Sequence, residues 1–287
     1  TTEIYTLSLH DALPISRIEL ENGTYYFLHL PKGFVDDGSW GLMLLLHGQC
    51  GDVPGILNTY LHGSNGGNFL EQHRFIGVVP RSKGELWSRM ESTPMLAVLD
   101  AMTRVKVNRD RVHVAGTSAG GFFAGWLGYE RPDIFKSVTV IAASLALADK
   151  DKVKKFPGRQ VFFFVGETDI HRKAAEDDFK KLQKAGNRFA RLFVRAGDGH
   201  QVKFWNDFDM LARYYTAIES GYDYPGQLEK ARKQLITNLE SSVSLIREIG
   251  TQPREDVFFE ELGVIKNIAN RKAEAKLAEL IDRKSAV

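Results

Sequence analysis

The chain has 287 residues, of which 43% are hydrophobic and 26% are charged, and its formal net charge is +2. This composition is typical of a globular protein with one large domain or a domain plus an appendage. The small net charge gives no reason to expect nucleic acid as a partner, and no apolar run reaches the roughly 20 residues that a membrane-spanning helix needs. The single cysteine, Cys50, excludes a disulfide within the chain.

The first sixteen residues resemble translated sequencing-adapter sequence, so residues 1–16 are set apart as an artefactual leader. No basic-then-apolar secretion signal is visible. Because we expect the natural N-terminus to be missing, a secreted or periplasmic origin is as compatible with the sequence as a cytoplasmic one.

Strand and helix patterns alternate along residues 17–220. Residues 23–30 are rich in aromatic and β-type residues and predict an edge strand. Further strands, several of them continuous apolar runs typical of a parallel sheet buried on both faces, are predicted at 41–46, 75–79, 111–115, 137–143, 161–165 and 190–194. Helices are predicted at 94–105, 119–129 and 172–185. This order predicts a mostly parallel sheet with helices on both faces.

The pattern changes after about residue 220. Residues 227–248 place apolar side chains on one helical face, and two further helical stretches follow without a strand signal. We therefore expect residues 221–287 to form a C-terminal helical extension that packs on the preceding domain or on a partner, including a second copy of the chain.

The central chemical signal is Gly116-Thr117-Ser118-Ala119-Gly120, a G-x-S-x-G match between a predicted strand and a predicted helix. In such a turn the serine hydroxyl projects from the end of the sheet while the backbone is strained, and glycines remove the clashes that side chains would cause. We predict Ser118 as a nucleophile.

A serine hydroxyl needs a base to take its proton, and in this motif's fold the order along the chain is serine, acid, histidine. Only two histidines follow Ser118. His200 lies in a glycine-rich loop after the last predicted strand, whereas His171 is two residues from an acidic candidate. We choose His200 as the base.

Three carboxylates compete for the role of the acid. Asp169 follows the strand at 161–165, at the carboxyl end where α/β sheets place functional groups. Glu167 is closer to that strand and Asp198 is closer in sequence to the base, and both rank below Asp169.

The reaction also creates a negatively charged oxygen, which two backbone N–H groups normally stabilise. The first is the amide of Ala119, directly after the nucleophile. The second should come from the loop after residues 41–46, where we choose Gln49. His47 in the same loop is interpreted as a buried structural histidine.

Several runs resemble one family: LLLHGQCGD, VKVNRDRVHVAGTSAGGFFA, GETD and GDGH, with TYYFLHLPKGF near the start. They are similar to the poly(3-hydroxybutyrate) depolymerase, feruloyl esterase and acetylxylan esterase branch of the α/β hydrolases. The resemblance covers about residues 20–217 and implies the nucleophile, acid and base at Ser118, Asp169 and His200. Leu86-Trp87 stands where members often carry a Cys-Trp pair, so Trp87 either lines the substrate pocket or only packs.

We therefore expect the α/β-hydrolase fold and a serine carboxylesterase that forms an acyl-enzyme intermediate and needs no metal or cofactor. Its substrate would be a small-molecule or polymer-linked ester, such as one attached to a plant polysaccharide, or a polyester. A serine peptidase of the prolyl-oligopeptidase type stays open, although such enzymes normally carry a large N-terminal propeller. A non-catalytic binding module that uses the C-terminal helices is the second alternative.

Overall fold

The computed structural model describes residues 3–4, 15–51, 53–62, 68–145, 153, 156, 160–208, 211–212, 214–215, 230, 233–234 and 237. The chain divides into two compact units, Thr1–Phe208 and Asp209–Val287. The first unit carries the sheet and the candidate site. The predicted helical extension at 221–287 lies almost entirely outside the described residues.

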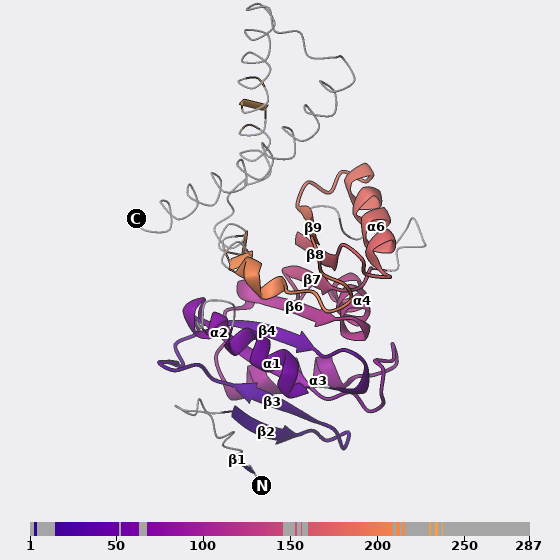
Figure 1. The fold of residues 1–287 in the computed structure, drawn as a ribbon. Helices are drawn as coiled ribbons and strands as arrows, with labels where there is room; N and C mark the ends of the chain where they lie inside the picture. Colours follow the sequence, from indigo (N-terminus) through magenta and orange to yellow (C-terminus); the bar gives the residue numbers. More distant parts are fainter. Residues whose placement is uncertain are drawn as a thin grey trace, which may run out of the picture. The chain divides into compact units, whose positions relative to one another are not determined.

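A single nine-stranded sheet organises the first unit (Figure 1). In chain order its strands are β1 (Glu3–Ile4), β2 (Ile15–Glu19), β3 (Tyr25–His29), β4 (Gly41–Leu46), β5 (Phe75–Pro80), β6 (Val112–Thr117), β7 (Ser137–Ile141), β8 (Gln160–Gly166) and β9 (Ala190–Arg195). Their order in space is β1-β2-β3-β5-β4-β6-β7-β8-β9. The pairs from β1 to β5 are antiparallel, and those from β5 through β4 to β9 are parallel.

Helices cover both faces of the parallel part, as the alternating pattern predicts. The helices are α1 (Val53–Leu61), α2 (Phe69–Gln72), α3 (Thr93–Arg104), α4 (Ala119–Glu130) and α6 (Arg172–Lys184). Buried side chains of α3, α4 and α6 join one hydrophobic cluster on the first face. On the second face, a Cβ atom on Gly77 of β5 would lie 2.9 Å from Leu70 of α2 and 3.7 Å from Leu57 of α1.

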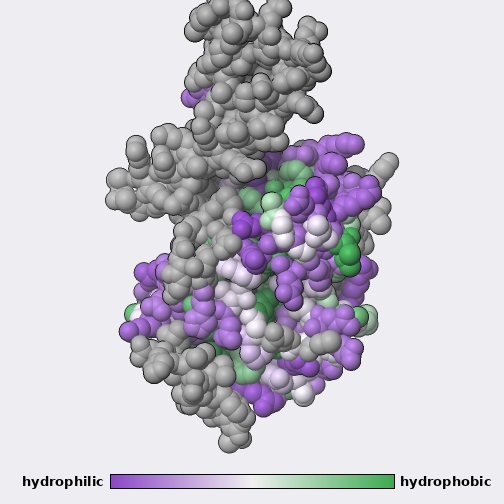
Figure 2. Space-filling view, viewed as in Figure 1, coloured by the Kyte–Doolittle hydropathy of each residue, from purple (hydrophilic) through white to green (hydrophobic). Residues whose placement is uncertain are grey.

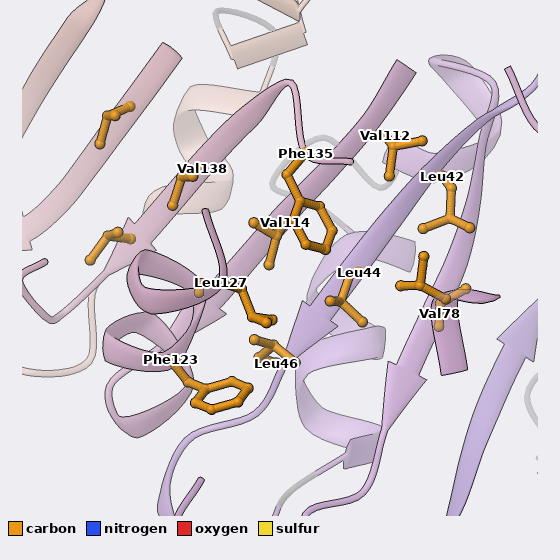
Figure 3. Packing of buried hydrophobic residues seen from close by; sticks show 14 of the residues in the cluster. Leu42, Leu44, Leu46, Val78, Val112, Val114, Phe123, Leu127, Phe135 and Val138 are labelled. Atoms are coloured by element: carbon orange, nitrogen blue, oxygen red, sulfur yellow. The ribbon is translucent and has the colours of Figure 1, made fainter. Parts of the chain in front are cut away.

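The apolar runs form strands because a sheet covered on both faces has no solvent side. Every residue of β4, β5, β7 and β8 is buried. Alternate residues of β4, Leu42, Leu44 and Leu46, point into the first-face cluster, where Phe123 and Leu127 of α4 pack close to Leu46 (Figure 3). Burial of each such side chain contributes roughly 1.5–3 kcal/mol, so this face anchors the helix that follows Ser118.

The strands and helices predicted between residues 23 and 194 are present, with their ends shifted by at most two residues. One prediction is wrong: β3 is not an edge strand, because β2 pairs with it on one side and β5 on the other. The strand β2 begins at Ile15, so its first two residues belong to the segment 1–16 that was set apart. Its sequence gives a weak strand signal because only Ile15 and Ile18 are buried, while Arg17 pairs with Glu19 across 2.7 Å.

Hydrophilic residues dominate the described surface in the view of Figure 2, and apolar side chains show only in small areas. None of the helices in the described part of the chain is both long and apolar enough to cross a lipid bilayer.

Candidate active site

Ser118 occupies the sharp turn between β6 and α4. Its φ of 53° is a left-handed value that few residues other than glycine adopt. The Ser118 N–H donates a 2.8 Å hydrogen bond to the Ile141 carbonyl at the end of β7, and the Ser118 carbonyl accepts from Phe122 in the first turn of α4. The strained residue is therefore fixed to the neighbouring strand and to its own helix.

The two glycines of the motif allow main-chain segments to approach each other. A Cβ atom on Gly116 would lie 2.1 Å from the carbonyl oxygen of Gly120, and one on Gly120 would lie 2.3 Å from the carbonyl oxygen of Leu46. Both neighbours are backbone atoms, which cannot rotate away. The G-x-S-x-G spacing is thus required by close packing of β4, β6 and the start of α4.

The structure brings Ser118, His200 and Asp169 into one hydrogen-bonded chain. His200 Nε2 lies 2.9 Å from Ser118 Oγ, and His200 Nδ1 lies 3.2 and 3.3 Å from the two carboxylate oxygens of Asp169. The Asp169 side chain is fully buried, whereas that of His200 is 43% exposed. A carboxylate at Nδ1 orients the imidazole with its Nε2 lone pair towards the serine, which is the arrangement needed for proton abstraction.

The buried carboxylate has a second partner. Asp169 Oδ1 accepts a 2.8 Å hydrogen bond from the backbone N–H of His171, at the start of α6. The His171 ring packs edge-on against the ring of His200, with centroids 5.5 Å apart, and against Phe122 at 5.0 Å. His171, which was rejected as the base, therefore lies beside the triad but does not bridge Ser118 and Asp169.

The two lower-ranked carboxylates bind elsewhere. Glu167 Oε2 accepts from the backbone N–H of Gly197 at 3.0 Å, and Asp198 Oδ2 accepts from the backbone N–H of Lys203 at 2.8 Å. Both bonds shape the loop that carries His200. Of the three candidates, only Asp169 has its carboxylate at the imidazole.

The loop after β4 lies next to the nucleophile on its other side. A Cβ atom on Gly48 would lie 3.6 Å from the Cβ atom of Ser118, and Gln49 follows directly as the first residue of a short 3₁₀ helix, Gln49–Gly51. Ala119 is the first residue of α4, where backbone N–H groups have no partner within the helix. Both predicted oxyanion donors thus belong to segments that adjoin Ser118.

His47 is a buried structural histidine, as predicted. It is 1% exposed, and its Nε2 accepts a 3.2 Å hydrogen bond from the backbone N–H of Ser82. Its Nδ1 lies 2.6 Å from the Gly48 carbonyl and so carries the proton that it donates there. The imidazole connects the loop after β4 to the loop after β5.

An aromatic pocket of about 200 Å³, partly open to solvent, includes Ala119 in its lining. Trp87, for which the sequence left open a place in a pocket or a packing role only, is one of its lining residues. The indole N–H of Trp87 donates a 2.8 Å hydrogen bond to the His47 carbonyl, and the ring stacks on Phe123 at 5.5 Å. The remaining lining residues are Arg89, Phe122, Phe123, Gly125, Trp126, Tyr129, Leu145 and Phe156.

The sequence analysis missed most of this pocket. Phe122, Trp126 and Tyr129 follow each other at helical spacing along α4, and this signal marks one face of a helix without saying what that face meets. Arg89 stands in an irregular segment and carries no pattern at all.

No protein-family model and no curated protein matches the sequence. Solved structures do match. An esterase from Rhizomucor miehei is 14% identical with a TM-score of 0.56, over 73% of this chain and 84% of that chain. The feruloyl esterase module from Clostridium thermocellum, solved with sinapinate, is 12% identical with a TM-score of 0.51, over 76% and 85%. A thermostable esterase is 20% identical with a TM-score of 0.49, over 64% of this chain, which spans only 54% of its length.

The two matches with TM-scores above 0.5 agree with a mostly parallel sheet that carries helices on both faces. The chain has the α/β-hydrolase fold.

Proposed function

We propose that this protein is a serine carboxylesterase that hydrolyses carboxylic esters through an acyl-enzyme intermediate. The observation that carries the proposal is the hydrogen-bonded chain from Ser118 Oγ through His200 to the buried Asp169, with 2.9 Å between the serine oxygen and Nε2. Support of a weaker kind comes from the names of several structures that share the fold, which are those of esterases. One further structure with this fold is a putative dipeptidyl aminopeptidase IV from Bacteroides ovatus, so the peptidase alternative needs its own test.

In the first half-reaction, His200 Nε2 takes the proton of Ser118 as its oxygen attacks the ester carbonyl. The Asp169 carboxylate stabilises the imidazolium that forms. Backbone N–H groups of Ala119 and Gln49 would donate to the oxyanion, and removal of one such donor typically costs roughly 10²–10³ in kcat. His200 then protonates the leaving alcohol.

In the second half-reaction, water takes the place of the alcohol. His200 accepts a proton from the water as its oxygen attacks the acyl group on Ser118, and the same donors hold the second oxyanion. The bond between the acyl carbon and Ser118 Oγ then breaks, His200 returns the proton to Ser118 Oγ, and the carboxylic acid leaves. All these groups belong to the protein, so the proposed reaction requires neither a metal nor a cofactor.

The direct test is hydrolysis of p-nitrophenyl acetate, butyrate and octanoate by the parent and by Ser118→Ala. We expect the parent to hydrolyse at least one ester and the variant to lose at least ~10³-fold in kcat. A fluorophosphonate should label the peptide that contains Ser118 in the parent only. A folded parent that is inert on every ester and unlabelled would contradict the proposal and favour the binding-module alternative.

Hydrolysis of anilides by the same preparation distinguishes an esterase from the peptidase alternative. A serine peptidase would cleave dipeptidyl p-nitroanilides with a kcat/KM similar to or greater than that for the esters. We expect ester hydrolysis to exceed anilide hydrolysis, and the opposite ratio would favour the peptidase.

A further inference from the structure

The aromatic pocket beside Ser118 contains one charge. Of its ten lining residues, six are aromatic and one, Arg89, is ionised. Aromatic walls favour a planar apolar group by burial and ring stacking, and they offer it few polar contacts. The single guanidinium in this lining therefore indicates which chemical group the ligand carries in addition to its aromatic ring.

Among the residues that the structure describes, none neutralises the charge of Arg89. It is exposed, and no hydrogen bond or ion pair connects its guanidinium to any residue of the described chain. The nearest acid in sequence, Glu91, instead accepts a 2.7 Å hydrogen bond from the backbone N–H of Lys83. By contrast, Arg104, Arg131 and Arg172 of the same unit each pair with a carboxylate.

The segment that carries Arg89 is held in place on both sides. On one side Trp87 donates to the His47 carbonyl at 2.8 Å. On the other side Ser88 accepts two bonds, its Oγ from the Met90 N–H at 3.2 Å and its carbonyl from the Glu91 N–H at 2.9 Å. Residues 88–91 therefore form a hydrogen-bonded turn directly after Trp87, which anchors the segment to the loop after β4.

The pocket lining combines three kinds of group. It contains Ala119, the proposed oxyanion donor, six aromatic side chains and the guanidinium-bearing Arg89. A guanidinium binds carboxylates through two parallel hydrogen bonds.

We propose that the pocket selects esters in which the half that enters it is a planar apolar group ending in an anion, and that Arg89 binds this anion. The simplest such substrate is a half-ester of an aryl dicarboxylic acid. The inference rests on the proposed esterase function, since it names the substrate class of that site.

Binding can be tested without catalysis, because Trp87 and Trp126 line the pocket and report on its occupancy by fluorescence. Ser118→Ala protein is titrated with monomethyl esters of aryl dicarboxylic acids that differ in the distance between the carboxylate and the ester. Each is paired with a neutral ester in which a methyl group replaces the free carboxylate. For at least one spacing, we expect the anionic ester to bind roughly three- to tenfold more tightly than its neutral partner.

Two further substitutions in this background assign the effect. Arg89→Met should abolish the preference for the anionic ester. Lys83→Met removes the same charge from the same loop outside the pocket lining, and it should leave the preference intact. An equal preference for the anionic ester in all three proteins would overturn the proposal. Equal losses of this preference in both variants would also overturn it, because they would indicate the general positive potential of the loop and not a contact with Arg89.

Turnover by the Ser118-containing proteins separates the two hypotheses. If kcat/KM is higher for the anionic esters and this difference disappears in Arg89→Met, the result supports both the esterase function and anion binding by Arg89. Hydrolysis of neutral esters without any anionic preference overturns the Arg89 proposal alone. Anionic selectivity in binding, without turnover of any ester, would overturn the esterase function and leave an anion-selective pocket.

Discussion

Gly166 and Gly199 lie so close together that a Cβ atom on Gly166 would come within 2.1 Å of the Gly199 carbonyl oxygen. Gly166 ends β8, three residues before Asp169, and Gly199 directly precedes His200. The absence of a side chain at position 166 lets the segment that carries the acid reach the loop that carries the base. The contact between Asp169 and the His200 imidazole thus depends on a glycine outside the triad.

Substitution of this glycine should damage the site without touching a triad residue. In Gly166→Ala the added methyl group meets backbone atoms, so the two loops must separate. We expect kcat/KM on p-nitrophenyl esters to fall at least ~10-fold and the free energy of unfolding to fall by roughly 1–3 kcal/mol. Enzyme kinetics and urea unfolding measure the two effects.

Gly199→Ala is the matched control. A Cβ atom there would meet only Thr168 Oγ1 at 3.5 Å, an ordinary contact, and its φ lies outside the left-handed region. Activity and stability should stay close to those of the parent. If the two alanine variants behave alike, the close approach at position 166 is not what joins the loops.

Neutralisation of Asp169 should remove the group that orients and stabilises the His200 imidazolium. Asp169→Asn keeps the size of the side chain and loses its charge, and we expect kcat to fall by roughly 10³–10⁴ with a small change in KM. Glu167→Gln keeps an oxygen that can accept from the Gly197 N–H and should retain most of the activity. A larger loss for the glutamine variant would transfer the role of the acid to Glu167.

Trp87 should act on catalysis through the loop after β4. Trp87→Phe keeps an aromatic ring against Phe123 and removes the 2.8 Å hydrogen bond to the His47 carbonyl. We expect stability to fall by about 1 kcal/mol and kcat to fall roughly threefold, because Gln49 follows in that loop.

Trp126→Phe is the control for this change. Trp126 lines the same pocket, and its indole N–H makes no hydrogen bond within the described part of the chain. The Trp126→Phe substitution should alter KM with little effect on kcat or on the free energy of unfolding. A kcat loss of equal size in both variants would show that Trp87 contributes only pocket surface.

The buried His29 should make the fold sensitive to acid. It lies on β3 beside Gly77, is fully buried, and neither ring nitrogen has a hydrogen-bond partner among the described residues. Burial lowers the pKa of its imidazole from 6.5 to about 4. Between these values the unfolded chain binds a proton that the folded chain does not, so stability is full above pH 6.5 and is lost as pH falls towards 4.

The expected loss is about 3 kcal/mol over this interval, since each pKa unit corresponds to about 1.4 kcal/mol. In His29→Leu the difference in the free energy of unfolding between pH 7.5 and pH 4.5 should shrink by about 2 kcal/mol. Urea titrations at the two pH values give this difference. An unchanged difference would mean that other groups cause the acid sensitivity.

The sequence by itself determined the parallel part of the sheet and the order of the triad residues. Short apolar runs such as residues 41–46 are typical of strands buried on both faces, and a G-x-S-x-G turn requires glycines where main chains meet. Asp169 and His200 could be chosen because the carboxyl ends of parallel strands meet at one edge of the sheet. These are local constraints, and each is visible within a few residues.

Only the tertiary structure decided which side chains meet across the loops. β2 shows two buried residues in five, so its pairing with β3 depends on a neighbour ten residues away and not on its own pattern. Three such contacts join segments that are far apart in the chain. They are the hydrogen bond from Trp87 to His47, the close approach of Gly166 to Gly199, and the place of Arg89 in the pocket lining. Contacts of this kind have no period or spacing in the sequence, because they arise from how irregular loops pack once the sheet has fixed their ends.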